Sequence, residues 1–214
     1  MTSKTADIGL VSSHPEVYEP SDDSFALVDA LLADRTNLIE HNPRICMEIG
    51  CGSGYVITSL ILLLRNEVPS AHYLATDTNP IASRVTRETL KAHGVDAHVI
   101  CTDIPYGIEK TFAGSVDVMV VNPPHVPTPE SEVGKEGIAS AWCGGEKGRE
   151  GWFYLVTSTS NLPSEICLMM RKKGYASRIV VQRSTEEENL LILKFWRDKD
   201  EECLDKETSF PKFL

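Results

Sequence analysis

Short apolar runs recur along the chain, and glycine, proline, asparagine or aspartate residues separate them. Such runs, rich in β-branched residues, are typical of buried strands. The most apolar run, YVITSLILLL at 55–64, is too short to span a bilayer and predicts a buried helix. The predicted strands are 44–50, 72–77, 97–103, 116–122, 152–157, 178–184 and 189–196.

Three other segments, 21–34, 80–93 and 162–174, carry apolar residues at helical spacing. The second has clear end signals, because Asn79 is a good N-cap, a proline follows it, and Gly94 can end the helix. Strands therefore alternate with helices over most of the chain. This alternation predicts an α/β fold with a mostly parallel sheet that helices cover on both faces.

The last two predicted strands are joined by only four residues, so we expect them to form an antiparallel hairpin at the end of the sheet. We assign residues 1–196 to one domain, in which residues 1–34 form a covering segment and a helix. Residues 197–214 are expected to form a charged, mobile tail.

Composition narrows the functional classes. The net charge of −10 argues against a broad basic groove for nucleic acid. The six cysteines form no CxxC pair, which favours reduced thiols in an intracellular protein over a zinc cluster, so we predict no metal site. The first residues, MTSKTADIGL, lack the long apolar run of a signal peptide, and we predict no membrane association.

A glycine-rich turn follows the first predicted strand in MEIGCGSGY, 47–55. Gly50 and Gly52 allow a sharp turn and a close approach of a ligand to the backbone. The third glycine comes one residue too early for a dinucleotide fingerprint. Glu48, on the strand before the turn, would repel a pyrophosphate and favour a cationic group.

Two further acids end the next two strands. Asp77 is placed to accept hydrogen bonds from ribose hydroxyls, and Asp103 to accept one from an adenine amino group. Each acid alone is more often a turn or helix cap. Together with Glu48 they fit a nucleoside that carries a positive charge and no pyrophosphate, which is S-adenosylmethionine.

The stretch VVNPPHVPTP at 120–129 ends the fourth predicted strand, because proline cannot donate to a sheet ladder. Asn122 is therefore expected at the strand exit with its carboxamide free. The carboxamide oxygen of Asn122 and the backbone carbonyl of Pro123 could accept the two N–H groups of a planar amide. Such positioning aims the nitrogen lone pair at a methyl group, and no strong base is needed.

These motifs resemble those of the HemK-type glutamine methyltransferases of translation release factors, and most closely their eukaryotic branch. The resemblance covers about residues 12–197 and rests on EIGCGSG, on VVNPPHVPTP and on EVGKEGIASAWCGGEKGRE at 132–150. The segment VYEPSDDSF, 17–25, resembles the part that in this family folds over the methionine portion of the cofactor.

The resemblance implies a Rossmann-like class I methyltransferase that uses S-adenosylmethionine to methylate the glutamine of a Gly-Gly-Gln tripeptide in a class 1 release factor. It also implies a heterodimer with a small zinc-binding activator protein. We expect the protein in the cytoplasm, with the nucleus as a second candidate location.

By the same resemblance, one group of residues would line the cofactor and another would contact the substrate. The cofactor residues are Ser24, Glu48, Gly50, Gly52, Asp77, Asp103, Ile104 and Asn122. The substrate residues are Asn122, Pro123, Pro124 and His125, of which Asn122 and Pro123 are the catalytic pair.

The chain departs from the family pattern in two places. His125 stands where the family has an aromatic residue, usually tyrosine, which should weaken substrate packing. The stretch 145–150 runs directly into Trp152, with no room for the family's helix before the fifth strand. We therefore expect a shortened variant in which one face of the sheet lacks cover and exposes apolar surface.

Three alternatives remain open at this point. The same fold could methylate protein lysine, and an asparagine followed by two prolines also occurs in adenine N6-methyltransferases of DNA and RNA. The acidic chain argues against direct nucleic-acid binding, because such an enzyme must grip phosphates. The third alternative is a variant that binds cofactor or activator and has lost turnover, for which His125 and the missing helix are the motivation.

Overall fold

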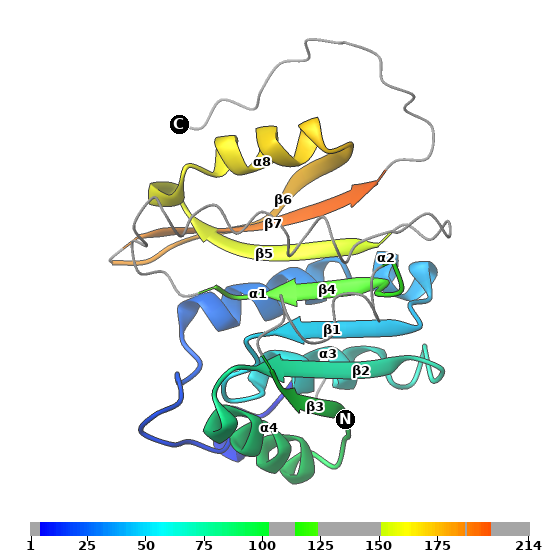
Figure 1. Ribbon diagram of the computed structural model, residues 1–214, viewed down its shortest axis with the longest axis vertical. Coiled ribbons are helices and arrows are strands. Elements are labelled where there is room, and N and C mark those ends of the chain that lie inside the picture. Colours follow the sequence, from blue (N-terminus) through cyan, green and yellow to red (C-terminus); the bar gives the residue numbers. More distant parts are fainter. Residues whose placement is uncertain (1–4, 103–113, 124–150, 187, 198–214) are drawn as a thin grey trace.

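A seven-stranded sheet runs through the computed structural model, which describes residues 5–102, 114–123, 151–186 and 188–197 (Figure 1). The strand order is β3-β2-β1-β4-β5-β7-β6. The first five of these are parallel, and β7 is antiparallel to both β5 and β6. The strands are β1 Ile45–Ile49, β2 His72–Asp77, β3 His98–Cys101, β4 Val118–Val121, β5 Trp152–Ser158, β6 Tyr175–Ser184 and β7 Asn189–Arg197.

Continuous apolar runs form the central strands because both faces of the sheet are buried. All four residues of β4 are buried, and they alternate between two cores. Val118 and Val120 belong to the core under the first helices, whereas Met119 and Val121 belong to the core on the other face. The predicted mostly parallel α/β sheet with a C-terminal antiparallel hairpin is thus confirmed.

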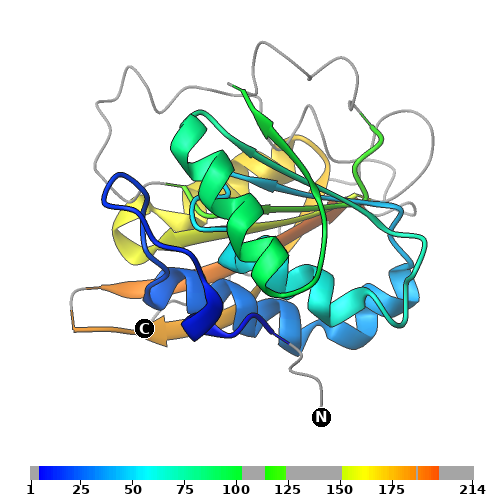
Figure 2. The same cartoon turned by 90° about the horizontal axis from the view of Figure 1, so that it is seen from below.

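Helices lie on both faces of the sheet. Leu31 of α1, Leu60 of α3 and Leu90 of α4 share one core, and Met170 of α8 belongs to the opposite one. Figure 2 shows α1 and α3 on one side of the sheet and α8 on the other. The helices are α1 Asp22–Ala33, α2 Arg35–His41, α3 Tyr55–Leu64, α4 Pro80–Ala92 and α8 Pro163–Lys172, with short 3₁₀ helices at Ile8–Leu10 and Thr159–Asn161.

Most boundaries agree with the sequence patterns, and the differences have local causes. The side chain of Asn79 accepts the N–H of Ile81 and caps α4 as predicted. Apolar periodicity does not reveal α2, because Leu38 is its only buried residue. β7 includes Arg197, which was predicted to begin the tail, and residues 198–214 lie outside the described part of the chain.

The predicted loss of cover on one sheet face concerns residues 124–150, which lie outside the described residues, so it stays a prediction. Within the described ranges, α8 is the only helix on that face. Ile45, Leu74 and Ile100 line a shallow depression of about 390 Å³ there. None of the described helices has the length and apolar character needed to cross a membrane.

Gly54, at the end of the glycine-rich turn, packs directly against α4. Its φ is +80°, and a Cβ built on it would lie 2.9 Å from the Cα of Thr86. That atom is backbone in the interior of α4, so it cannot move aside without displacing the helix. Only glycine therefore lets α3 begin so close to α4.

We predict that Gly54→Ala lowers the free energy of unfolding by about 3 kcal/mol, because overpacking adds to left-handed backbone strain. Gly94→Ala is the matched control: its φ is +63°, but nothing lies within 4 Å of its added Cβ. The control should lose only about 1 kcal/mol. Urea denaturation measures both, and equal losses would show that the contact with Thr86 is unimportant.

Candidate functional site

A cleft of about 820 Å³ opens at the carboxyl ends of β1, β2 and β4. Parallel α/β sheets bind ligands at this edge. The cleft brings together seven of the residues proposed from the sequence: Ser24, Glu48, Gly50, Gly52, Asp77, Asn122 and Pro123. The other four, Asp103, Ile104, Pro124 and His125, lie outside the described residues, so their roles stay predictions.

Glu48 lies at the base of the cleft and is 2% exposed. Its Oε2 accepts the N–H of Ile57 at 2.8 Å and so caps α3, whose N-cap residue Gly54 has no side chain. Burial raises the pKa of Glu48 well above its ordinary value, and the nearby charge of Asp77 raises this pKa further. A cation beside the carboxylate would favour its ionised form, so the site is suited to a positively charged ligand.

The glycine-rich turn is tied to β2 by backbone hydrogen bonds. Gly50 has a φ of +72°, and a Cβ added to it would meet nothing within 4 Å. Its N–H and that of Cys51 both donate to the carbonyl of Thr76 at 2.9 Å. The turn thus presents bare backbone to the cleft, where a ligand can approach closely.

Asp77 joins the turn to the start of α4. Its Oδ2 accepts the N–H of Gly52 at 2.9 Å, and its Oδ1 accepts the N–H of Asn79 at 2.9 Å. Each carboxylate oxygen can accept more than one hydrogen bond, so both retain capacity for a ligand. An acid at the end of the second strand is also the residue that commonly accepts a hydrogen bond from a ribose hydroxyl.

The N-terminal segment closes one side of the cleft. Its backbone is held by side chains in and directly after α4: Thr89 accepts the N–H of Ser12 at 3.0 Å, and the C-cap residue His93 accepts that of Asp7 at 2.9 Å. The side-chain amide of Asn79 donates to the carbonyl of Glu16 at 2.9 Å. Figure 2 shows this dark-blue segment running beside α4 towards α1.

Twelve of the residues that line the cleft were not proposed from the sequence, and three of them, Tyr18, Asp23 and Glu188, carry polar groups of interest. The hydroxyl of Tyr18 is 2.6 Å from that of Ser21 and donates to the carboxylate of Asp23 at 3.1 Å. Tyr18 and Asp23 belong to the motif VYEPSDDSF, which could have revealed them. Glu188 gave no local signal, because the turn between β6 and β7 brings it to the cleft from far along the chain.

Asn122 follows the last residue of β4, as the sequence predicted. Its carboxamide oxygen is buried and accepts no hydrogen bond within the described part of the chain. Leaving such an oxygen unpaired costs about 1–3 kcal/mol. A ligand N–H placed in the cleft would remove this cost, and Pro123 lines the cleft beside it.

The charge of the cleft is strongly one-sided. The described lining residues include five acids, Glu16, Asp23, Glu48, Asp77 and Glu188, and neither lysine nor arginine. A cleft lined by one sign of charge concentrates ligands of the opposite sign. It therefore favours a cationic ligand and disfavours phosphates and nucleic acid.

Nucleophilic and metal chemistry find little support in this lining. Histidine is absent from the described lining residues, and burial raises the pKa of the Cys51 thiol far above its ordinary value. Across the described ranges, no cluster of His, Cys, Asp and Glu side chains is placed to hold a metal ion. The arrangement can orient ligands and compensate positive charge.

Comparison with known families matches residues 11–168 to the family model described as Methyltransferase small domain. The human protein named Methyltransferase HEMK2 is 39% identical over 196 residues, which cover 84% of this chain and 89% of that protein. The Schizosaccharomyces pombe protein named eRF1 methyltransferase catalytic subunit mtq2 is 32% identical over 209 residues, which cover 85% and 90%.

A solved structure has a similar fold: the E. cuniculi Mtq2–Trm112 complex, which is described as responsible for the methylation of the eRF1 translation termination factor. It aligns with a TM-score of 0.56 and 24% identity, covering 85% of this chain and 99% of that chain. At this identity the likeness supports the fold alone.

We predict that Glu48→Gln stabilises the free protein at neutral and alkaline pH. The raised pKa means that wild-type Glu48 loses stabilising free energy as the pH rises through that pKa, whereas glutamine does not titrate. The glutamine oxygen can still accept the N–H of Ile57. Denaturation from pH 5 to pH 9 should show a difference between variant and wild type that grows with pH.

The matched control is Glu88→Gln, which removes a carboxylate exposed on α4. It should give a small difference without the same rise. A pH-independent difference for Glu48→Gln would contradict the assignment of a buried, costly carboxylate.

Proposed function

The chain belongs to the HemK-type branch of the small-domain methyltransferases, and from this premise we propose that it methylates a glutamine side-chain amide in a class 1 translation release factor. The single observation that carries the proposal is the buried carboxamide oxygen of Asn122, which lacks a donor within the described residues. The oxygen requires a hydrogen-bond donor, and the NH2 group of a glutamine side chain supplies one.

The cofactor of this family is S-adenosylmethionine, and the cleft suits it in charge, size and backbone access. When bound, it supplies a methyl group activated by a positively charged sulfur. Glu48 and Asp77 provide negative charge at the base of the cleft, and Asp77 keeps acceptor capacity for ribose hydroxyls. Gly50 leaves open the space that a side chain would fill.

Asn122 and Pro123 orient the substrate nitrogen. The oxygen of Asn122 accepts one N–H and the backbone carbonyl of Pro123 accepts the other, so the amide cannot rotate freely. Fixing its orientation helps the nitrogen to pyramidalise and directs the lone pair. Positioning of this kind contributes up to about 7–11 kcal/mol in good geometry. The surplus proton leaves after transfer, so no strong base is required.

The same lining favours glutamine over the other substrates. Lysine arrives as an ammonium ion and must lose a proton before it reacts, and the described lining offers no histidine to take it. A nucleobase would bring phosphates to a cleft lined by five acids. Glutamine brings neither difficulty.

We also propose a heterodimer with a small zinc-binding activator, acting in the cytoplasm where release factors work. The relative from E. cuniculi was solved in complex with Trm112, and its fold aligns over 85% of this chain. Co-expression with such an activator should raise the soluble yield and give a 1:1 complex on size-exclusion chromatography. Chelation of zinc should dissociate this complex, and an activator that never co-purifies would contradict the proposal.

We predict that Asn122→Ala lowers the rate of methyl transfer by about 10²- to 10³-fold, because one of two orienting acceptors is lost. Affinity for S-adenosylhomocysteine should change much less, since Glu48 and Asp77 remain. The assay is transfer of a radiolabelled methyl group to release factor carrying the Gly-Gly-Gln tripeptide, with calorimetry for cofactor affinity.

Asn161→Ala is the matched control, because Asn161 is exposed in a 3₁₀ helix and is not among the residues that line the cleft. A release factor with its glutamine replaced by alanine controls for the acceptor, and lysine peptides test the alternative substrate. Undiminished transfer by Asn122→Ala, or equal labelling of the alanine substrate, would overturn the proposed function.

A further inference from the structure

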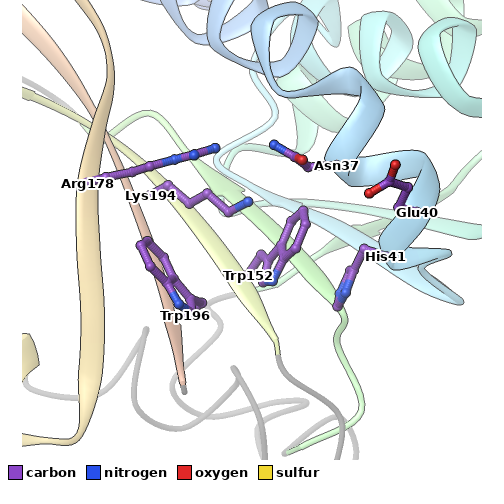
Figure 3. Close-up of a pocket in the computed structure, with 7 residues that line it drawn as sticks. All are labelled: Asn37, Glu40, His41, Trp152, Arg178, Lys194 and Trp196. Atoms are coloured by element: carbon purple, nitrogen blue, oxygen red, sulfur yellow. The ribbon is translucent and has the colours of Figure 1, made fainter. Parts of the chain in front are cut away.

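A second pocket, of about 340 Å³, lies at the amino ends of the parallel strands, whereas the cleft lies at their carboxyl ends. Trp152 begins β5, whose other end lies on the side of the cleft, and α2 packs nearby (Figure 1). Figure 3 shows the seven side chains of this anion pocket, as we name it. They are Asn37, Glu40, His41, Trp152, Arg178, Lys194 and Trp196.

The strand register sets the composition of the anion pocket. Lys194 of β7 lies opposite Tyr154 of β5 on one side and Arg178 of β6 on the other. Trp152 and Trp196 are two residues from Tyr154 and Lys194, so they lie on the same face of the sheet. One face of three strands thus presents two indoles and two cations towards α2.

The buried centre beside the pocket is Asp34, which is 1% exposed. Its carboxylate accepts the ammonium of Lys194 at 2.6 Å and also accepts hydrogen bonds from Arg178, Tyr154 and Asn37. Two cations therefore share one carboxylate. Within the described residues no ion pair joins Glu40 to either cation, so the two positive charges face the single carboxylate that both contact.

The two tryptophans differ in the contacts that their rings make with other described residues. His41 stacks on Trp152 at 4.1 Å between ring centroids, and the ammonium of Lys194 lies 3.0 Å from the centre of the Trp152 ring. The Trp152 ring is therefore already in contact with His41 and Lys194. Trp196 has no aromatic or cationic partner among the described residues, and the side chain of Arg178 is 46% exposed.

These contacts divide the cluster into two parts. Asp34, Lys194 and Tyr154 are buried and satisfy one another, which suffices for a structural role. Arg178 keeps unused donors, since a guanidinium has five N–H groups, and no ring or cation among the described residues contacts the Trp196 ring. Arg178 and Trp196 both line the same pocket. A purely structural cluster around Asp34 would not need these two side chains at the pocket.

We propose that the anion pocket binds a small organic anion, a carboxylate or phosphate carried on a planar ring, with its charge against Arg178 and its ring against Trp196. Guanidinium groups bind such oxyanions through paired hydrogen bonds, and ring stacking adds affinity. The pocket volume suits a single-ring acid. The proposal is independent of methyl transfer, because the pocket lies away from the cleft.

The charge state of the pocket supports an anion and gives a signature. Burial lowers the pKa of Lys194, Asp34 opposes this shift and the charge of Arg178 adds to it, and the resulting pKa is about 8. Lys194 is thus charged below about pH 8 and neutral above it. The remaining charged or titratable groups that face it are Asp34, Glu40, His41, Tyr154 and Arg178. Affinity for an anion should therefore fall as the pH rises through about 8.

The test uses the full chain carrying Trp142→Phe, which leaves Trp152 and Trp196 as its only indoles. Benzoate and phenyl phosphate are titrated at pH 7 and pH 9 while tryptophan fluorescence is recorded. Acetate and inorganic phosphate serve as ringless comparators, and the two ring acids distinguish a carboxylate from a phosphate ligand. We expect saturable quenching by at least one ring acid, with tighter binding at pH 7.

In this background, Arg178→Gln should weaken binding at least about tenfold, the value of one charge-assisted hydrogen bond. Arg183→Gln is the matched control, because Arg183 lies on the same strand and pairs with Asp29 away from the pocket. It should bind as tightly as its parent. If circular dichroism shows that Arg178→Gln does not fold, Trp196→Leu replaces it and should bind benzoate no better than acetate.

Two results would overturn the proposal. One is the absence of saturable quenching by both ring acids at pH 7. The other is equal affinity of the Arg178 and Arg183 variants or, where Trp196→Leu is used, an unchanged preference for the ring acid.

Discussion

The proposed function depends on the position of Asn122, which directly follows the end of β4. Two prolines follow Asn122 and end the strand, so its carboxamide stands at the sheet edge and not in the ladder. The oxygen is buried there without a donor in the described part of the chain. Such a group costs stability in the free protein and is repaired by a ligand N–H, which is what a site pre-organised for an amide requires.

Burial of Glu48 in the cleft likewise lowers the stability of the unliganded protein. Its carboxylate is buried at the start of α3, and its pKa is raised because burial disfavours its charge. A cationic ligand relieves this cost, as an amide relieves that of Asn122. Glu48 lies on β1 and Asn122 directly follows the neighbouring strand β4, so the sheet places the cofactor side and the substrate side of the site in one cleft.

Local chemistry made most of the fold predictable. The Asn79 cap, the glycine-rich turn and the apolar runs each act over a few residues, and the structure confirms the elements they predict. The short helix α2 escaped prediction because only Leu38 is buried. Glu188 was not predicted because the β6–β7 hairpin brings it to the cleft from far along the chain, and no local sequence pattern indicates this contact. Asp103, Ile104, Pro124 and His125 stay predictions.

The two ends of the strands differ in charge and therefore in the ligands they suit. Five acids line the cleft, whereas two cations share one buried carboxylate beside the pocket at the other edge. The register of β5, β7 and β6 aligns Tyr154, Lys194 and Arg178, and the sequence alone does not reveal this pairing. One sheet thus supports sites of opposite electrostatic preference.

The most direct measurement is a crystal structure of the complex with S-adenosylhomocysteine and a peptide containing Gly-Gly-Gln. The account predicts the glutamine Nε2 about 3 Å from both the Asn122 Oδ1 and the carbonyl oxygen of Pro123, facing the sulfur of the cofactor. A structure in which Asn122 turns away from the peptide, or in which other groups hold the glutamine amide, would contradict it.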